Sequence, residues 1–311
     1  MEAPLNATET IRHFSCAACG KCCTRAPEME LGEATALADK FITRLIFKLH
    51  TLPLDTKRGR AMAWWKRSGS ALPVKEALEE VRAHITLFSV DDVIDRDHKR
   101  TLHLTLSALP IHENRGACPH LIDARCAIYD VRPLTCRTTP FHYSRPASTL
   151  TAYLDRFTKT PGYLCDTSEA APAVLKGEGL AASELSVVRD EAFALTTRDR
   201  KWKQAIVAQL KAGSSAFGLP TYGDVLRNSD AGGATTVSMK AAWAVATQAG
   251  LMTQALFEDV CVKQLRLLRS VASGGESLQS DVLHAMLDDY ESTRPDRSEV
   301  LSQPTAASCL A

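Results

Sequence analysis

FSCAACGKCC, residues 14–23, carries four cysteines within ten residues. Two residues separate Cys16 from Cys19 and Cys19 from Cys22, a spacing that lets a tight turn direct sulfur atoms toward one centre. Gly20 can adopt the positive φ that such a loop often needs. Cys22 and Cys23 are adjacent, and neighbouring side chains diverge. We therefore expect one to face a first metal and the other a second metal, a partner group or the core.

A second group of cysteines follows in GACPHLIDARCAIYDVRPLTCRTTPF, residues 116–141, and one more lies in PGYLCD, residues 161–166. These spacings do not repeat the C-x2-C turn of a zinc ribbon. Ala26 occupies the position of the fourth cysteine of a bacterial ferredoxin run, which excludes that motif. The predicted metal ligands are the thiols of Cys16, Cys19, Cys22, Cys23, Cys118, Cys126, Cys136 and Cys165.

The cysteine spacing alone is compatible with more than one number and kind of metal centre. Eight thiolates suffice for two tetrahedral sites, and a single site with spare cysteines is equally compatible. Soft thiolate ligands suit both zinc and iron, including an iron–sulfur cluster. Two arginines among the cysteines, Arg132 and Arg137, are candidates to donate N–H groups to the sulfur atoms, or else to pair with Asp130 or helix ends.

Charge and hydropathy limit the partners. The 311 residues contain 37 Lys and Arg against 36 Asp and Glu, a net charge of +1, which gives no chain-wide attraction for nucleic acid or anionic membranes. No apolar run approaches the ~18–20 residues needed to cross a bilayer. The first residues, MEAPLNATETIRHF, lack the features of a secretory signal, so we expect a cytoplasmic protein with reduced thiols. A disulfide framework is the alternative if the chain is exported.

Hydrophobic periodicity predicts a mainly α fold with a small irregular or β metal-binding core. A cysteine-cluster domain, 1–175, is followed by a helical region, 176–295, packed against it, and by a tail, 296–311. Helices are expected over 29–50, 75–87, 184–211, 237–272 and 278–290, and a strand over 101–106. Residues 116–163 contain five prolines and no regular periodicity, so a metal core is expected to order them.

These cysteine motifs together resemble the CxxCxxCC, or YkgJ-type, cysteine-cluster family, which is described as zinc- or iron-chelating. The resemblance covers about the first 165 residues. The matching residues are Cys16, Cys19, Gly20, Cys22 and Cys23, then Cys118-Pro119, Cys126 with Tyr129-Asp130 and Arg132-Pro133, and Cys136-Arg137 before Pro140-Phe141.

The resemblance implies a cytoplasmic metal-chelating protein. Flagellin lysine-N-methylase is similar within the same group, which implies, as an alternative, a protein lysine methyltransferase that uses S-adenosylmethionine. A non-enzymatic assembly or adaptor protein that binds a protein partner is the third hypothesis. The only G-x-G, at Gly177 and Gly179, follows no clear strand and is expected to form a turn before a helix.

Several other residues are candidate ligands or contacts. His13, His120 and His142 lie near cysteines in the sequence and are secondary ligand candidates, although hydrogen-bonded histidines are commoner. Tyr129 is expected to be a buried aromatic with a paired hydroxyl. We expect Trp64-Trp65 to pack or to contact a partner, Cys261 to act as a small apolar residue in a helix, and Cys309 to lie in the tail.

Overall fold

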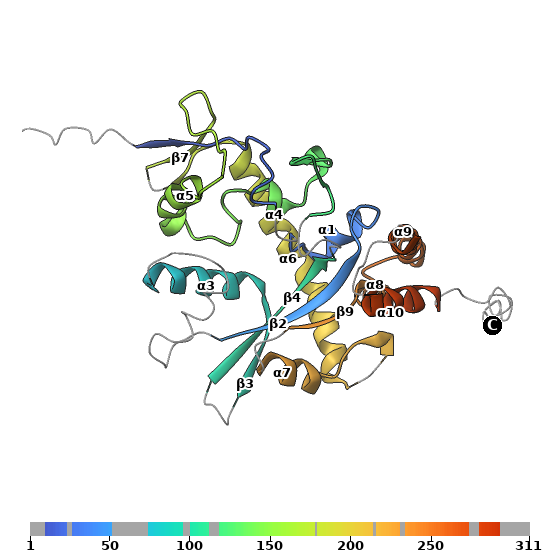
Figure 1. Cartoon of the computed structure of the whole chain (residues 1–311). Coiled ribbons are helices and arrows are strands. Elements are labelled where there is room, and N and C mark those ends of the chain that lie inside the picture. The colour runs from blue at the N-terminus through green and yellow to red at the C-terminus, as the bar shows by residue number, and fades with distance from the viewer. Residues whose placement is uncertain are drawn as a thin grey trace, which may run out of the picture.

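The computed structural model, drawn in Figure 1, describes most of the chain. The described residues are 10–23, 27–51, 74–95, 100–111, 118–177, 179–213, 216–230, 234–273 and 280–292. Trp64, Trp65, Cys309 and the predicted tail, 296–311, fall outside these ranges.

A four-stranded antiparallel sheet forms the centre of the molecule, with strand order β3-β4-β2-β9. Its strands are β2 (Thr43–Thr51), β3 (Ser89–Asp95), β4 (Arg100–Pro110) and β9 (Thr235–Ser238). Strands β2 and β4 pair in continuous register from Thr43↔Pro110 to Thr51↔Leu102. Side chains on one face of this pair, among them Leu45, Phe47, Leu104, Leu106 and Ala108, are fully buried in the main core. The strand expected over 101–106 is therefore confirmed, and it is longer than the sequence indicated.

The expected fold class is wrong in one respect: the protein is a mixed α/β structure with three small sheets. The predicted helix over 29–50 is instead a short helix, α1 (Leu31–Ala36), followed by the long strand β2. A spacing of four residues, as in Leu45 and Leu49, is also an even spacing, so it fits one face of a strand as well as a helix. Pairing with β4 on one side and β9 on the other decides in favour of the strand.

The expected helices after residue 175 are largely confirmed. Residues 184–211 form one long helix, α6 (Glu184–Lys211), which begins with a capping box at Ser183. The expected helix over 237–272 divides into β9, α8 (Met239–Gln248) and α9 (Gln254–Ser273), with Gly250 at φ +69° in the turn between the helices. Helices α7 (Tyr222–Asp230) and α10 (Ser280–Glu291) complete this part, preceded by the 3-10 turn η3 (Ala216–Gly218).

Two buried tryptophans connect these helices to the core. Trp202 on α6 donates from Nε1 to the Ala242 carbonyl (2.8 Å), and Trp243 on α8 donates from Nε1 to Oγ1 of Thr35 on α1 (2.9 Å). Gln264 on α9 is fully buried and donates to the carbonyls of Ala38 and Phe41. The helices and the sheet therefore share one packed interior.

The cysteine-bearing half lies beside the N-terminal end of α6 and consists of short elements (Figure 1). They are β1 (Ile11–His13), β5 (Leu121–Ile122), β6 (Arg125–Cys126), η1 (Tyr129–Val131), α4 (Leu134–Arg137), η2 (Ala147–Thr149), α5 (Leu150–Thr158), β7 (Ala173–Lys176) and β8 (Gly179–Leu180). Helix α3 (Val74–Phe88), predicted over 75–87, packs between this half and the central sheet. A small apolar cluster with Phe14, Phe141, Leu150, Leu154 and Leu175 supports these elements.

The domain boundary predicted near residue 175 stays a prediction. The structure adds that strand pairing connects the two parts, because β9 pairs with β2 from Arg44↔Ser238 to Phe47↔Thr235.

The glycines Gly177 and Gly179 belong to the β7–β8 hairpin rather than to a strand-to-helix turn of the kind that binds dinucleotides. Among the described helices, none combines the length and the apolar character needed to cross a bilayer.

Candidate metal centre

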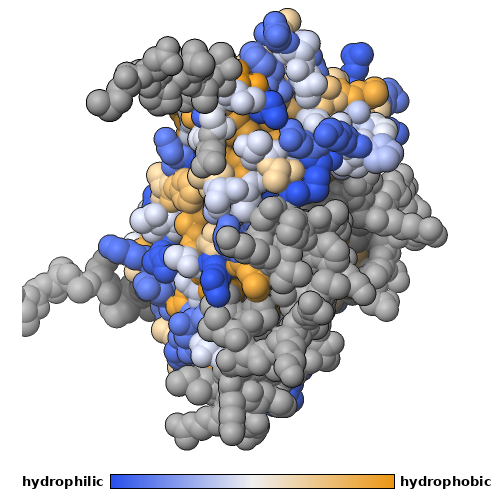
Figure 2. All heavy atoms as spheres, turned by 90° about the vertical axis from the view of Figure 1, so that its left-hand side faces the viewer, coloured by the Kyte–Doolittle hydropathy of each residue, from blue (hydrophilic) through white to orange (hydrophobic). Residues whose placement is uncertain are grey.

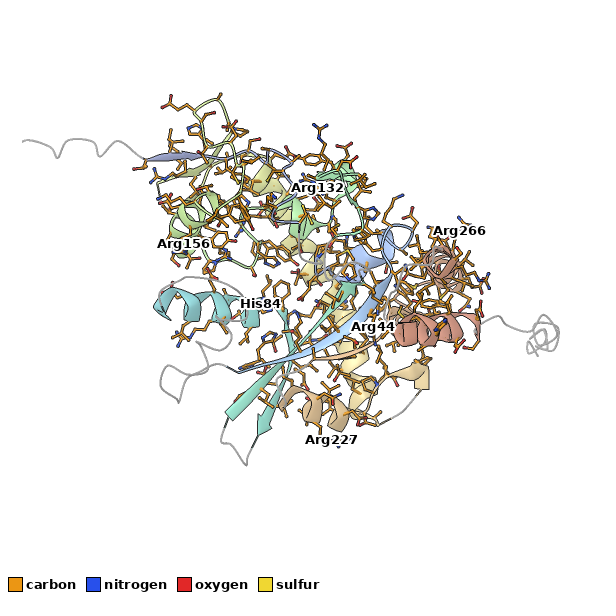
Figure 3. All side chains as sticks on the ribbon, viewed as in Figure 1. Arg44, His84, Arg132, Arg156, Arg227 and Arg266 are labelled. Atoms are coloured by element: carbon orange, nitrogen blue, oxygen red, sulfur yellow. The ribbon has the colours of Figure 1, made fainter. Side chains whose placement is uncertain are left out.

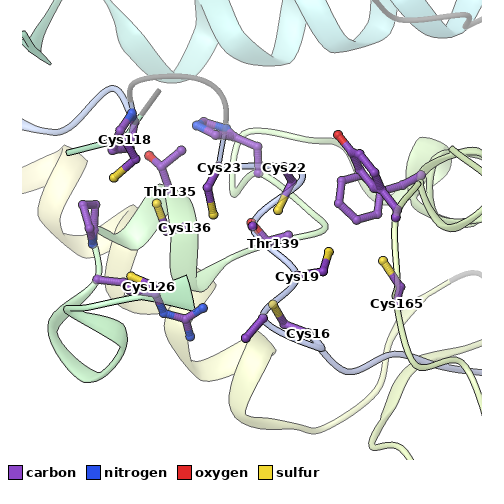
Figure 4. A pocket seen from close by; sticks show the side chains of 18 of the residues that line it. Cys16, Cys19, Cys22, Cys23, Cys118, Cys126, Thr135, Cys136, Thr139 and Cys165 are labelled. Carbon is purple, nitrogen blue, oxygen red and sulfur yellow. The ribbon is translucent and has the colours of Figure 1, made fainter. Parts of the chain in front are cut away.

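All eight cysteines predicted as metal ligands line one cavity of about 430 Å³ (Figure 4). They come from a loop over residues 16–23 and from segments that begin 95 positions later, at Cys118, and the nine described cysteines are all free thiols. Cys261 on α9 does not line this cavity and packs against the main core, as expected. The predicted ligands therefore lie around one cavity, and metal binding by them stays a prediction.

The first cysteine loop is shaped by backbone at positive φ. Ala18 lies at φ 52° and Gly20 at φ 70°, and the Cys23 amide donates to the Gly20 carbonyl (3.0 Å), which closes the turn. A Cβ atom on Gly20 would stand 2.7 Å from Cδ1 of Leu121 and 2.9 Å from the Ala124 carbonyl oxygen. Glycine is therefore required at position 20 because the backbone has a positive φ, and because the second cysteine segment leaves no room for a Cβ atom.

The second cysteine segment is held against this loop by backbone hydrogen bonds. The Cys118 amide donates to the Cys23 carbonyl (3.3 Å), and the Leu121 amide donates to the Cys118 carbonyl (3.0 Å). Leu121 pairs with Cys126 in the β5–β6 hairpin, which brings Cys126 back beside Cys118. Cys136 lies on α4, whose first amide, at Leu134, donates to the buried Glu33 carboxylate.

Cys165 reaches the cavity through a separate contact. Ser15 and Asp166 form an isolated antiparallel bridge, with the Ser15 amide donating to the Asp166 carbonyl (2.8 Å) and the Asp166 amide to the Ser15 carbonyl (3.1 Å). In an antiparallel pair the residues next to the bridge also face one another. The bridge therefore sets Cys16 opposite Cys165.

Electrostatic coupling connects thiols throughout the cavity, and the charge of Cys23 raises the pKa of Cys19 and Cys22 as well as that of Cys136. Burial, together with the negative charges of Cys23 and Cys118, raises the pKa of Cys136 to about 12. Burial also raises the pKa of Cys118, with Cys126 and Cys23 adding to it. The pKa of Cys165 is raised by burial and then by Cys19 and Cys16. In Figure 4 the thiols lie on two sides of the cavity, with Cys23, Cys118, Cys126 and Cys136 on one side and Cys16, Cys19, Cys22 and Cys165 on the other.

Two thiols of the first loop are favoured as thiolates. The pKa of Cys23 is lowered to about 6, because its sulfur accepts a hydrogen bond from the Cys22 thiol and lies near the Arg132 guanidinium. The same hydrogen bond, with Cys22 as donor, raises the pKa of Cys22. Backbone N–H groups of Leu164 and Lys21 lower the pKa of Cys19. Both shifts favour the thiolate, which is the form of cysteine that binds metals.

The two arginines proposed as donors to sulfur differ in their surroundings. Arg132 lines the cavity, donates from Nε to the Tyr129 carbonyl (2.7 Å) and stacks 3.5 Å from the centre of the Tyr129 ring. Figure 3 locates it among the loops of the cysteine-bearing half. Arg137 forms an ion pair with Glu191 on α6 (3.2 Å) and does not line the cavity. Tyr129 is 41% exposed rather than buried, contrary to expectation.

Of the three histidines considered as ligands, one faces the cavity. His142 lines it, with Nδ1 paired to Oγ of Ser144 (2.8 Å). His13 pairs with the Ala171 carbonyl (2.7 Å), and His120 pairs with the Lys40 carbonyl (2.8 Å) while packing edge-on against Phe41.

The cavity is also lined by titratable residues that no sequence motif indicated. His84, on α3, lines the cavity with Glu28, Glu80 and Arg145, and Glu80 is paired with Arg145. Burial lowers the pKa of His84 well below its ordinary value and that of His142 to about 4, so both rings are neutral. His84 lies one turn after the buried Val81 and directly before the buried Ile85, and no local motif distinguishes it from an ordinary helix residue.

The chemistry of the donor set fits a thiophilic metal. Eight sulfur atoms, a neighbouring guanidinium and apolar residues such as Phe14, Phe41 and Phe157 surround the cavity, a setting that suits zinc or iron rather than calcium or magnesium. Apolar surface gathers in a band on the side of the molecule facing the viewer in Figure 2. Within the described ranges, no three His, Cys, Asp or Glu side chains are already arranged to hold one metal ion.

Comparison with known proteins agrees with this donor chemistry. Residues 74–166 match the CxxCxxCC family. The description of that family reads "Putative zinc- or iron-chelating domain", so the similarity supports metal chelation by this part of the chain. The match takes in Cys118, Cys126, Cys136 and Cys165 and leaves out the loop of residues 16–23, which the structure places beside them. No curated protein matches the chain, and no solved structure matches it either.

Proposed function

We propose that this protein binds zinc or iron, as free ions or within an iron–sulfur cluster, through the thiolates that line the cysteine cavity. The observation that carries the proposal is the convergence of eight thiols from separate segments on one cavity. Soft sulfur ligands favour these metals, and the matched family is described as chelating the same two.

The charge of such a centre needs compensation. A zinc ion or an iron–sulfur cluster held by four thiolates is negatively charged, and a negative centre is costly to bury without a counter-charge. Arg132 supplies a guanidinium beside Cys23 and lowers its pKa. This arrangement supports ligation by Cys23 in particular.

The proposal also gives the metal a role in folding. Elements around the cavity are short, from the two-residue strands β5 and β6 to the four-residue helix α4, and short elements bury little surface. Structural zinc contributes on the order of 10 kcal/mol to folding in small domains. We therefore propose a structural role for the metal in the cysteine-bearing half, in a reducing compartment such as the cytoplasm.

Anaerobic purification followed by elemental analysis and an absorption spectrum tests the proposal. We expect stoichiometric zinc in colourless protein, or iron with the visible sulfur-to-iron charge-transfer absorption of a cluster. Cys126→Ser should reduce the metal content and the melting temperature, whereas Cys261→Ser, outside the cavity, should leave the metal unchanged. Protein that contains neither metal after anaerobic preparation, and that does not bind added zinc or iron, would refute the proposal.

A further inference from the structure

We infer that the cavity holds two separate metal centres, each bound by four thiolates and joined through the Cys22–Cys23 peptide. This inference rests on the proposed function and assigns the ligands within it. The first centre, here the Cys165 site, uses Cys16, Cys19, Cys22 and Cys165. The second, here the Cys136 site, uses Cys23, Cys118, Cys126 and Cys136.

The Cys165 site is assembled by the bridge between Ser15 and Asp166. Two backbone hydrogen bonds of 2.8 and 3.1 Å fix that bridge, and it sets Cys16 and Cys165 opposite each other. The Cys19 sulfur accepts the N–H of Leu164, the residue before Cys165. In Figure 4 Cys22 lies on the same side of the cavity as Cys19 and Cys16. Four thiols from two segments thus lie around one end of the cavity (Figure 4).

The Cys136 site is assembled by different contacts. Cys118 bonds through its amide to the Cys23 carbonyl, and the β5–β6 hairpin returns Cys126 to the neighbourhood of Cys118. Cys136, on α4, lies on the same side of the cavity as Cys23 and Cys118 in Figure 4. The Arg132 side chain lines the cavity with these cysteines.

The adjacent pair Cys22 and Cys23 separates the two groups. A tetrahedral centre takes four sulfur ligands, so eight thiols do not suit one mononuclear ion. The Cys22 and Cys23 sulfur atoms share a hydrogen bond, which places this pair where the two groups meet. In Figure 4 the Cys23 sulfur lies with Cys136 and Cys118, whereas Cys22 lies on the side of Cys19 and Cys16. Consecutive residues therefore serve different centres, which sets the two metals close together.

Metal stoichiometry of matched variants tests this division. Wild type, Cys165→Ser, Cys136→Ser, the double variant and the control Cys261→Ser are purified anaerobically, and zinc, iron and acid-labile sulfide per chain are measured. We expect each single substitution to remove half of the metal, the double variant to remove all of it, and the control to match wild type. Cys22→Ser and Cys23→Ser should each remove half as well.

X-ray absorption on the wild type supplies a readout that does not require the variants to fold. Four sulfur neighbours per zinc, or four sulfurs per iron in a cluster, with no protein nitrogen or oxygen in the coordination shell, are expected. If one single substitution removes all the metal from a folded chain, or if wild type holds one centre only, the division is wrong while the proposed function stands. If wild type binds neither zinc nor iron, the proposed function itself fails.

Discussion

Ser15 and Asp166 exchange two backbone hydrogen bonds across 151 positions of the sequence, and this bridge connects the first cysteine loop to the last cysteine of the cavity. Neither side chain takes part. The contact therefore depends on backbone N–H and C=O groups, which any residue except proline can supply in full.

Asp166→Pro removes the N–H that donates to Ser15 and should release Cys165 from the cavity wall. We expect a loss of up to half of the bound metal, measured by elemental analysis. Asp166→Ala is the matched control, since it keeps the backbone donor and removes only the carboxylate that accepts the Ser168 amide. Equal metal content in the two variants would show that the bridge does not position Cys165.

Gly20→Ala should destabilise the cysteine-bearing half, because φ is +70° and the new methyl group would meet Leu121 and the Ala124 carbonyl at less than 3 Å. We expect a loss of about 2–4 kcal/mol in the free energy of unfolding, measured by urea denaturation. Gly162→Ala provides the comparison: φ is +83° but nothing lies within 4 Å of the added Cβ. That variant should lose only about 1–2 kcal/mol from the left-handed backbone.

Gln264→Leu should be among the most destabilising single substitutions in the core. The side-chain amide donates to the Ala38 and Phe41 carbonyls and accepts the Thr43 N–H (3.0 Å), so leucine would leave three buried backbone groups unpaired. A loss of about 3–5 kcal/mol is expected in chemical denaturation. Gln254→Leu, at an exposed position of the same helix, should change stability by less than about 0.5 kcal/mol.

Asp199→Asn should change how stability depends on pH. Burial raises the pKa of Asp199 to about 6, and Glu30 adds to the rise, while the Gly32 amide and Lys203 oppose it. Because the folded pKa lies above the ordinary 3.8, the native state binds the extra proton between about pH 4 and pH 6. The stability that the neutral acid contributes is therefore complete below about pH 4 and is lost as the pH rises through 6.

Asparagine stays neutral and retains an acceptor for the Gly32 amide, which lies 2.7 Å from the carboxylate. The variant should match wild type near pH 4 and exceed it by about 3 kcal/mol at pH 8. Urea denaturation at both pH values measures this. A difference between variant and wild type that is the same at pH 4 and pH 8 would contradict the expectation.

The sequence was informative where local spacing carries the signal. Cysteine spacing led to the eight residues that line one cavity. It was uninformative where long-range pairing decides: β2 has an apolar pattern that fits both a helix and a strand, and its neighbours β4 and β9 settle the matter. His84 and Glu28 reach the cavity from distant elements, so their proximity to the cysteines could not be deduced before the fold was known.

Strand β9 comes from residues 235–238, yet it pairs with β2, whose residues precede it by almost two hundred positions. During synthesis on the ribosome, most of the polypeptide must be made before β9 can pair with β2. Until then its hydrogen-bonding edge is open to other strands, including those of other nascent chains. A fragment that ends after the last cavity cysteine would retain this open edge permanently, and we expect it to aggregate even when its metal ligands are complete.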